Sequence, residues 1–481
     1  MRTTMRTPVL ILATLFTSSL FAAGHDLPPS SPTANQLRPV VTGNGSGFTA
    51  AWIEQALGRN TVVSSIVNAN GEPIEGGSAA VDQKSASSIA IAHSPSETLI
   101  AWTAADGNLF AERLSPAGIP LSRTLVTFGK DYLSDVAVAW NGSRYFVVWS
   151  TAAQLLGAFV APDGSSTTPR PFFIETSQTG HGPEELALTP DIAWDGQHFI
   201  VVFAEVPNRI CPNLCPQPDP DRFRVMRLSA DGDAIDSTPL LIAGSHLRAH
   251  VASSGSESLI ALDSHREVST IILHTEGGLT LDAETPVFHW FSDVASAVVW
   301  DGSTFIAAWS YPGADASWIG AVHVTRSGQP FDYRVAATRT LAPVWWGGPS
   351  MAVNDAGATA FTVTEAVGPL QLARARLYLS SEFAPAPAPP PAPRNVVSYF
   401  GGTAARIDWQ SDPAAGFLIE WSWDFGKDWN FVETVPGDAR TATVYAAVGN
   451  LFRVRAFGPG GVSEGTITSI GSMQRSRAAR R

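Results

Sequence analysis

The sequence predicts an all-β protein made of seven related units followed by a second, smaller β domain. Three observations carry this prediction. Apolar runs rich in Val, Ile and aromatic residues flank Asn-Gly or Asp-Gly pairs, which is the pattern of a β-hairpin. A large apolar residue recurs seven positions after most of these glycines. A proline-rich stretch then separates the repeats from a last segment of about 80 residues.

The clearest hairpin runs from Asp293 to Trp309, where Asp301-Gly302 separates two apolar runs. Because Asp-Gly tolerates positive φ angles, we expect a tight type I′ turn there. Equivalent landmarks lie 47 to 59 residues apart, at Gly45, Pro95, Gly142, Gly196, Gly255, Gly302 and Gly357. Seven residues after each landmark we expect a core position, occupied by Trp52, Trp102, Trp149, Phe203, Leu262, Trp309 and, as the polar exception, Thr364.

Each unit contains further turn signals that divide it into four strands. A fainter Gly turn follows in most units, as at Asn70-Gly71 and Asp231-Gly232, so a unit reads as a four-stranded meander. Runs such as Tyr145 to Trp149 are apolar without alternation. Both faces of such strands must therefore be covered. Sheets of similar length stacked around an axis cover one another in this way.

Residues 25–380 resemble bacterial β-propellers built from units close to W-[DN]-G-x-x-[FY]-x-x-x-W. The resemblance implies a seven-bladed β-propeller, a fold that hosts binding proteins and enzymes alike. The last unit runs into proline after three strands. The ring would be closed if residues 25–36 pair there, although Pro28, Pro29 and Pro32 make this segment a poor strand, and the sequence leaves open which strand closes the ring.

The first residues have the layout of a cleavable secretory peptide, because Arg2 and Arg6 precede an apolar run and small residues follow it. We expect residues 1–24 to be removed and the protein to be secreted, periplasmic or on the cell surface. The apolar run is too short to span a bilayer comfortably. In an oxidising compartment, Cys211 and Cys215 favour a small local disulfide. The alternative, half of a metal site, would need two further ligands.

Residues 381–393 include the run APAPAPPPAP and mark a domain boundary. We expect an extended spacer of roughly 30 Å that forms neither helix nor sheet. Residues 394–472 resemble a fibronectin type III domain, with Arg406 to Trp409 as the strand of the core Trp and Phe452 to Ala456 as the penultimate strand. The family usually has Tyr where Phe452 stands, which implies the loss of one hydrogen bond. The basic residues 473–481 are expected to be a disordered tail.

No catalytic signature stands out. The net charge of −12 disfavours nucleic-acid binding. Metalloprotease, serine-hydrolase, phosphate-loop and dinucleotide motifs do not occur, so we expect no cofactor and no metal. Ser422 to Trp429 is similar to the Asp box of sialidases, but one copy outside the repeats is interpreted as a structural turn. His246 and His250 would share a face only on a helix, so we interpret them as structural.

One group of residues does indicate a ligand site. In a propeller, the loops from strand four to the next strand one and from strand two to strand three lie on the same face. Here these loops carry aromatic residues that form a predicted ligand platform, namely Tyr132, Trp290, Tyr311, Trp318, Trp345 and Trp346. The alternative is that these rings pack over the core. Asp135, Asp191 and Asp293 near that face are interpreted as turn residues rather than as a cation site.

We therefore expect an exported, noncatalytic binding or scaffolding protein, monomeric and without cofactor. It would recognise glycan or protein at the cell exterior through one face of the propeller. Two alternatives stay open. A secreted glycan hydrolase or lyase would need two carboxylates, or a carboxylate with Tyr or His, close together on that face. A purely structural role in an envelope assembly would need neither ligand platform nor catalytic groups.

Overall fold

The computed structural model describes residues 24–29, 31–82, 86–128, 135–151, 154–174, 189–205, 221–264, 267–289, 295–312, 317–338, 349–367, 372–401, 404–424, 426–427, 429–445 and 451–470. The described chain is almost entirely strands and turns, and its one helix is the short 3-10 segment η1 (Ser380–Glu382). The predicted all-β class is confirmed. In this part of the chain no helix has the length and hydropathy needed to cross a membrane.

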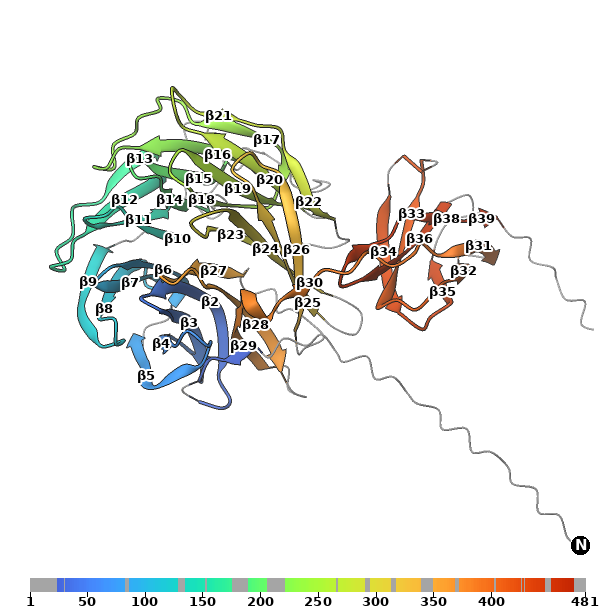
Figure 1. Cartoon of the computed structure of the whole chain (residues 1–481), viewed down its shortest axis with the longest axis horizontal. Coiled ribbons are helices and arrows are strands. Elements are labelled where there is room, and N and C mark those ends of the chain that lie inside the picture. Colours follow the sequence, from blue (N-terminus) through green and yellow to red (C-terminus); the bar gives the residue numbers. More distant parts are fainter. Residues whose placement is uncertain are drawn as a thin grey trace, which may run out of the picture.

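The described part of residues 25–385 forms seven sheets arranged around a common centre (Figure 1). The first three sheets are β2 (Asn35–Asn44), β3 (Gly47–Ala56), β4 (Arg59–Val67) and β5 (Pro73–Asp82); β6 (Ala86–Ser94), β7 (Glu97–Ala104), β8 (Asn108–Leu114) and β9 (Pro120–Phe128); and β10 (Val136–Trp140), β11 (Tyr145–Ser150), β12 (Gln154–Val160) and β13 (Arg170–Ile174). Each is an antiparallel meander in sequence order, as the turn signals predicted.

The next two sheets continue this pattern. They contain β14 (Asp191–Trp194), β15 (Phe199–Glu205), β16 (Asp221–Leu228) and β17 (Leu240–His246); and β18 (Arg248–Ser253), β19 (Glu257–Asp263), β20 (Glu267–His274), β21 (Thr280–Leu281) and β22 (Thr285–His289). In the second of these, β21 and β22 both pair with β20, so the outer strand is divided into two short pieces.

The last two sheets receive strands from distant parts of the chain. They contain β23 (Ala295–Trp300), β24 (Phe305–Pro312), β25 (Ser317–Val324), β26 (Pro330–Ala337) and β30 (Ala384–Pro385); and β27 (Ser350–Val353), β28 (Thr359–Val367), β29 (Leu372–Leu379) and β1 (His25–Asp26). The first strands of successive sheets lie innermost and contact one another in a closed cycle of β2, β6, β10, β14, β18, β23, β27 and again β2. The seven sheets therefore form a closed ring.

The ring is closed by the N-terminal end of the described chain, which settles the strand that the sequence left open. His25 pairs with Leu377 in β29. Asp26 forms an ion pair with the buried Arg376 at 2.8 Å. The prolines do not prevent this pairing, because β1 is only two residues long and ends before them. Closure of a sheet by the first and last segments ties the two ends of the ring together.

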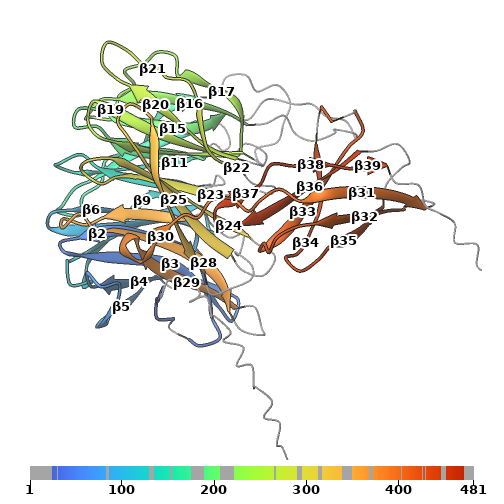
Figure 2. The same cartoon turned by 45° about the vertical axis from the view of Figure 1, so that its right-hand side comes forward.

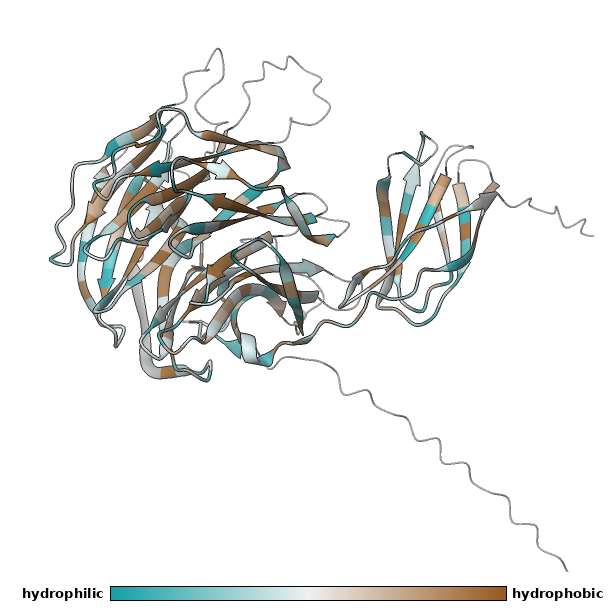
Figure 3. Ribbon diagram, turned by 45° about the horizontal axis from the view of Figure 1, so that its top comes forward, coloured by the Kyte–Doolittle hydropathy of each residue, from teal (hydrophilic) through white to brown (hydrophobic). Residues whose placement is uncertain are grey.

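The core lies between neighbouring sheets, and hydrophobic residues, brown in Figure 3, are concentrated on the strands. The predicted core positions are all buried, and Trp52, Trp102 and Trp149 expose 1% of their surface or less. Each lies on the second strand of its sheet, which is covered by a sheet on either side. Truncating such a ring to Ala removes enough contact to cost about 3–5 kcal/mol.

The Asp-Gly turns differ from the predicted type I′ geometry. Gly302 has φ of 96°, but Asp301 does not have positive φ, which a type I′ turn requires at both central residues. Instead the Asp301 carboxylate accepts hydrogen bonds from the amides of Ser303 and Thr304, both at 2.7 Å. The Asp thus caps the turn with its side chain while glycine alone takes the left-handed conformation.

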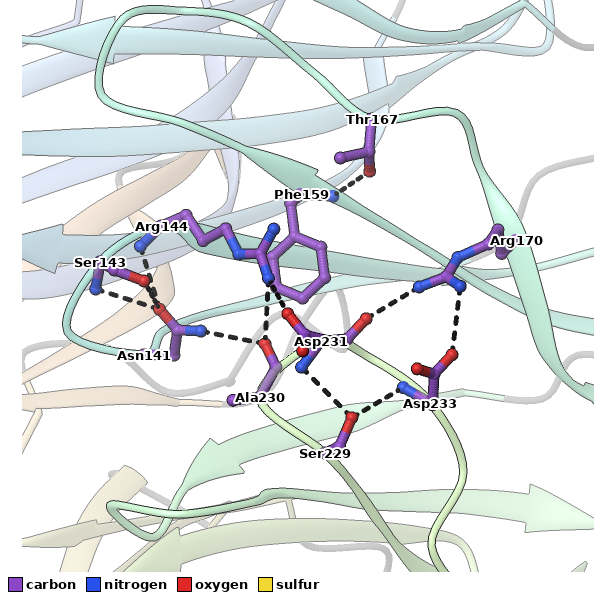
Figure 4. A network of polar contacts seen from close by, with 10 residues as sticks. All are labelled: Asn141, Ser143, Arg144, Phe159, Thr167, Arg170, Ser229, Ala230, Asp231 and Asp233. Carbon is purple, nitrogen blue, oxygen red and sulfur yellow. Dashed lines mark hydrogen bonds and ion pairs between the residues drawn. The ribbon is translucent and has the colours of Figure 1, made fainter.

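Neighbouring sheets are also joined through their turns (Figure 4). The side-chain amide of Asn141, in one Asn-Gly turn, donates from Nδ2 to Ala230 O of the next sheet at 3.3 Å. Beside it, Arg144 pairs with Asp231 at 2.5 Å and lies over the ring of Phe159 at 3.8 Å. Asn44 donates to Pro116 O in the same manner at 2.8 Å. The two kinds of turn signal seen in the sequence therefore contact each other across sheets.

The smaller domain contains two sheets packed face to face. One has β31 (Arg394–Gly401), β32 (Ala404–Gln410), β35 (Thr441–Tyr445) and β39 (Ser469–Ile470); the other has β33 (Gly416–Ser422), β34 (Asn430–Pro436), β36 (Leu451–Gly458), β37 (Gly461–Val462) and β38 (Thr466–Ile467). Trp409 and Phe452 lie in the core between them. Asp424 accepts a hydrogen bond from the amide of Lys427 at 3.1 Å, so the Asp-box-like segment is a structural turn here.

Candidate functional site

The structure describes two of the six residues of the predicted ligand platform. Tyr311 in β24 and Trp318 in β25 lie directly opposite each other, with ring centroids 5.5 Å apart. They expose 1% and 5% of their surface, so they are packed rather than presented to solvent. The other four platform residues lie outside the described residues, and so do the two cysteines and one of the three aspartates, namely Tyr132, Trp290, Trp345, Trp346, Cys211, Cys215 and Asp293.

Tyr311 and Trp318 are buried by the smaller domain. They share one hydrophobic cluster with Leu418 of β33 and Phe457 of β36. Figure 2 shows this domain beside the ends of β22 and β24, and β37 contacts β22. The prediction of a ligand platform assumed that these rings are exposed. The sequence of the repeats does not show that a segment of another domain covers them. For Tyr311 and Trp318 the structure shows the alternative, in which the rings pack over a hydrophobic core.

A hydrogen bond fixes the contact between the two domains. The Tyr311 hydroxyl donates to Pro459 O at 2.9 Å, in the turn between β36 and β37. Burial raises the pKa of Tyr311 far above its ordinary value, so the phenol stays neutral and remains a donor. A neutral buried phenol with a carbonyl partner satisfies its polar group while its ring fills the core.

The proline-rich linker is also part of this contact. Ala384 and Pro385 form β30 and pair with Val335 and Arg334 of β26, so the expectation that this run forms no sheet is wrong for its first residues. Proline is tolerated because β30 is an edge strand. Further on, a Cβ at Gly460 would lie 2.0 Å from Pro387 O, so the linker lies against the β36–β37 turn. The linker is docked at both places and not a free spacer.

The centre of the ring holds a second group of candidate residues. Asp191, at the start of β14, accepts the amide of Val251 in β18 at 2.9 Å. Asp263, at the end of β19, accepts the amide of Ser296 in β23 at 2.9 Å. Both carboxylates thus bind the innermost strand of the following sheet. Ser88 and Ser350 form the same kind of bond at other places in the ring, with their hydroxyl oxygens as acceptors.

His250 of β18 lies between these two carboxylates. Its Nδ1 is 3.4 Å from Asp191 Oδ2. Burial by itself lowers the pKa of His250, but the hydrogen bond and charge of Asp191 and the charge of Asp263 outweigh burial and raise it. Asp263 is fully buried, and burial raises its pKa despite the nearby charge of His250 and the hydrogen bond from the Ser296 amide. The ring centre therefore favours a charged imidazole beside a carboxyl group that tends to keep its proton.

The remaining aspartate does not belong to this cluster. Asp135 forms an ion pair with Arg38 at 3.0 Å, and both side chains are partly exposed. Among the described residues no group of three His, Cys, Asp or Glu side chains is arranged to hold a metal ion. Asp135 and Asp191 were interpreted as turn residues, whereas the bonds that the structure shows join them to Arg38 and to the amide of Val251 in other sheets.

The cluster of Asp191, His250 and Asp263 has the elements of an acid–base site, because an imidazole is oriented by one carboxylate and lies near another. Sequence reasoning missed it. Asp263 ends a strand whose sequence gives no sign of a functional carboxylate. His250 was considered only together with His246, whose Nε2 lies 3.7 Å from Glu284 Oε2 in the structure. The signal that could have found it is the strand register, since His250 and Asp263 lie on adjacent strands two pairs apart and so on the same face of the sheet.

No protein-family model matches the chain, and no curated protein matches it. Solved structures do. They include the BP39L lectin from Burkholderia pseudomallei, with 12% identity, 68% of this chain and 96% of that chain covered and a TM-score of 0.48. The β-propeller domain of the Trilobed protease from Pyrococcus furiosus has 9% identity, with 73% and 97% covered and a TM-score of 0.42. The WD40 domain of Toxoplasma gondii coronin has 8% identity, with 73% and 85% covered and a TM-score of 0.42. These neighbours are β-propeller proteins.

Proposed function

We propose that the chain is an exported, noncatalytic binding or scaffolding protein, a seven-bladed β-propeller that carries a docked fibronectin type III-like domain. One observation carries the binding role. The loop end of β24 and β25 already holds a folded domain through buried aromatic rings and a hydrogen bond from Tyr311. Buried aromatic anchors with one satisfied polar group are the features by which protein surfaces recognise each other.

The ligand would bind on the same face, beside the docked domain. Tyr132, Trp290, Trp345 and Trp346 are the aromatic residues that the repeat pattern assigns to this face. Glycan or extracellular protein is the proposed ligand, because planar aromatic side chains bind the apolar faces of sugars and anchor protein interfaces alike. Export is supported by the layout of residues 1–24, which also supports the proposed Cys211–Cys215 disulfide.

A glycan array and a screen of extracellular proteins test this role on the full exported chain. We expect saturable binding that falls about tenfold or more in the double variant Trp345→Ala and Trp346→Ala, as for truncation of interface anchors. Trp423→Ala is the matched control, because Trp423 is 67% exposed on the smaller domain. Equal loss in the control, or none in the double variant, would place the ligand elsewhere.

The second candidate is a secreted glycan hydrolase or lyase, and the cluster of Asp191, His250 and Asp263 favours it. We rank it below binding for a physical reason. Asp191 accepts the amides of Ile192 and Val251, one with each carboxylate oxygen, and Asp263 is fully buried. Carboxylates engaged in this way cannot reach a substrate without breaking the ties between sheets. Release of sugar products that disappears in His250→Gln, with the fold retained, would favour the enzyme.

A further inference from the structure

Three buried polar atoms near the centre of the ring have no hydrogen-bond partner in the described chain. They are His250 Nε2, Asp263 Oδ1 and Ser296 Oγ. Their strands β18, β19 and β23 all contact one another. An unpaired buried polar group costs about 1–3 kcal/mol, and native proteins rarely leave one unpaired. Three such atoms on neighbouring strands therefore call for a shared partner.

The contacts of His250 in the described chain indicate the nature of that partner. In the described chain, His250 has one carboxylate within ion-pair distance, Asp191 at 3.4 Å. No ion pair of His250 with Asp263 is found among the described residues, yet the charge of Asp263 affects the titration of His250. Meanwhile Ser296 is bound to Asp263 through its amide at 2.9 Å. A single water molecule bridges groups that are too far apart for a direct bond and uses about two to four polar partners.

We propose that one internal water molecule binds His250 Nε2, Asp263 Oδ1 and Ser296 Oγ. It completes a hydrogen-bonded chain of Asp191, His250, water and Asp263 across two neighbouring sheets, and Ser296 joins this chain from a third sheet. When His250 is charged, its Nδ1–H donates to Asp191 and its Nε2–H donates to the water. The water then donates to Asp263 Oδ1 and accepts from the Ser296 hydroxyl. Every side-chain donor in this chain then has an acceptor.

The same water also fits the neutral imidazole. His250 keeps Nδ1–H toward Asp191, and the water donates to Nε2 and to Asp263 while it accepts from the Ser296 hydroxyl. Titration of His250 therefore reverses the direction of one hydrogen bond and breaks none. The other charged group near this chain is Arg248, two residues before His250 on β18 and paired in register with Asp263. The water site lets the ring centre change its protonation without opening the ring.

A high-resolution crystal structure of the full chain tests the site directly. We expect one density peak at roughly 2.6–3.2 Å from each of the three atoms. In Ser296→Val the side chain fills the position, so the peak should disappear. A direct bond between His250 and Asp263, a dry site, or a cation with more ligands than these three would each overturn the proposal.

A histidine titration followed by NMR provides a second readout that does not depend on crystals. The wild-type titration midpoint of His250 is expected above ~6.5, and Ser296→Val should move it by about half a pH unit or more. Ser258→Val is the matched control, because Ser258 is equally buried on β19 at the other end of the strand. If both variants fold and neither moves the midpoint, or both move it equally, the water bridge is wrong. Ser296→Ala serves if Ser296→Val does not fold, with a smaller shift in the same direction.

Discussion

Replacing Tyr311 with Phe should loosen the docking of the smaller domain while both domains stay folded. The change removes one hydroxyl group and keeps the ring that packs against Trp318. The hydroxyl donates to Pro459 O at 2.9 Å across the domain contact. Without it, the carbonyl of Pro459 loses its donor whenever the domains are docked, whereas water can serve it when they separate.

The size of this effect follows from the burial of the group. Tyr311 is 1% exposed, so loss of the bond is expected to cost about 1–2 kcal/mol of docking free energy. This is a factor of roughly 5–30 in the ratio of docked to undocked chains. Tyr311→Ala also removes the ring and should cost about 3–5 kcal/mol, as for other buried aromatic residues.

Native-state hydrogen exchange measures this opening in the complete chain. Amides of β37 and the adjoining end of β36 should exchange roughly 5–30 times faster in Tyr311→Phe, in line with the lost free energy. Tyr333→Phe is the control, since Tyr333 is 40% exposed and only its backbone oxygen binds the linker. The reasoning is refuted if exchange in β36 and β37 is the same in both variants.

Three other perturbations have defined outcomes. Deleting residues 25–27 removes the pairing with β29, so the melting temperature should fall. Deleting residues 479–481 is the control, and an equal fall in its melting temperature would contradict closure of the ring by β1. Arg144→Ala should lower the free energy of unfolding, measured by urea denaturation, by about 0.5–2 kcal/mol because the contact with Phe159 is lost. A double-mutant cycle with Asp231→Ala should assign about 1 kcal/mol or less of this loss to the exposed ion pair. Burial raises the pKa of Asp263, so the folded state binds this proton more tightly than the unfolded state does. The resulting contribution to stability is present at low pH and is lost as the pH rises through the raised pKa. Asp263→Asn should therefore flatten the fall in stability from about pH 4 upward, and an unchanged slope would contradict the raised pKa.

The repeats could be predicted because their signals are local. A turn glycine and a buried ring seven residues later are set by one hairpin, as at Gly302 and Trp309, whatever the rest of the chain does. The conformation of the turn was less accessible, because Asp301 could either take positive φ itself or cap the turn amides. Only the backbone distinguishes the two.

Contacts between distant segments could not be predicted. The sequence indicated that Tyr311 and Trp318 are exposed loop aromatics. Nothing in their repeat indicates that Leu418, about a hundred residues later, covers them. The linker read as a free spacer for the same reason, since the open edge of β26 is invisible in the composition of residues 384–393. The ring-centre cluster needs the order of the sheets around the ring, because Asp191 and His250 come from different repeats.

The most direct test of the binding role is a titration of the full chain with the glycan or protein that an unbiased screen recovers, combined with analysis of whether the ligand is chemically changed. We predict saturable binding that weakens in the double variant Trp345→Ala and Trp346→Ala, with the recovered ligand chemically unchanged. Two results together would contradict this account. The ligand would be converted over time by the wild type but not by His250→Gln, and the double variant Trp345→Ala and Trp346→Ala would bind the ligand with unaltered affinity.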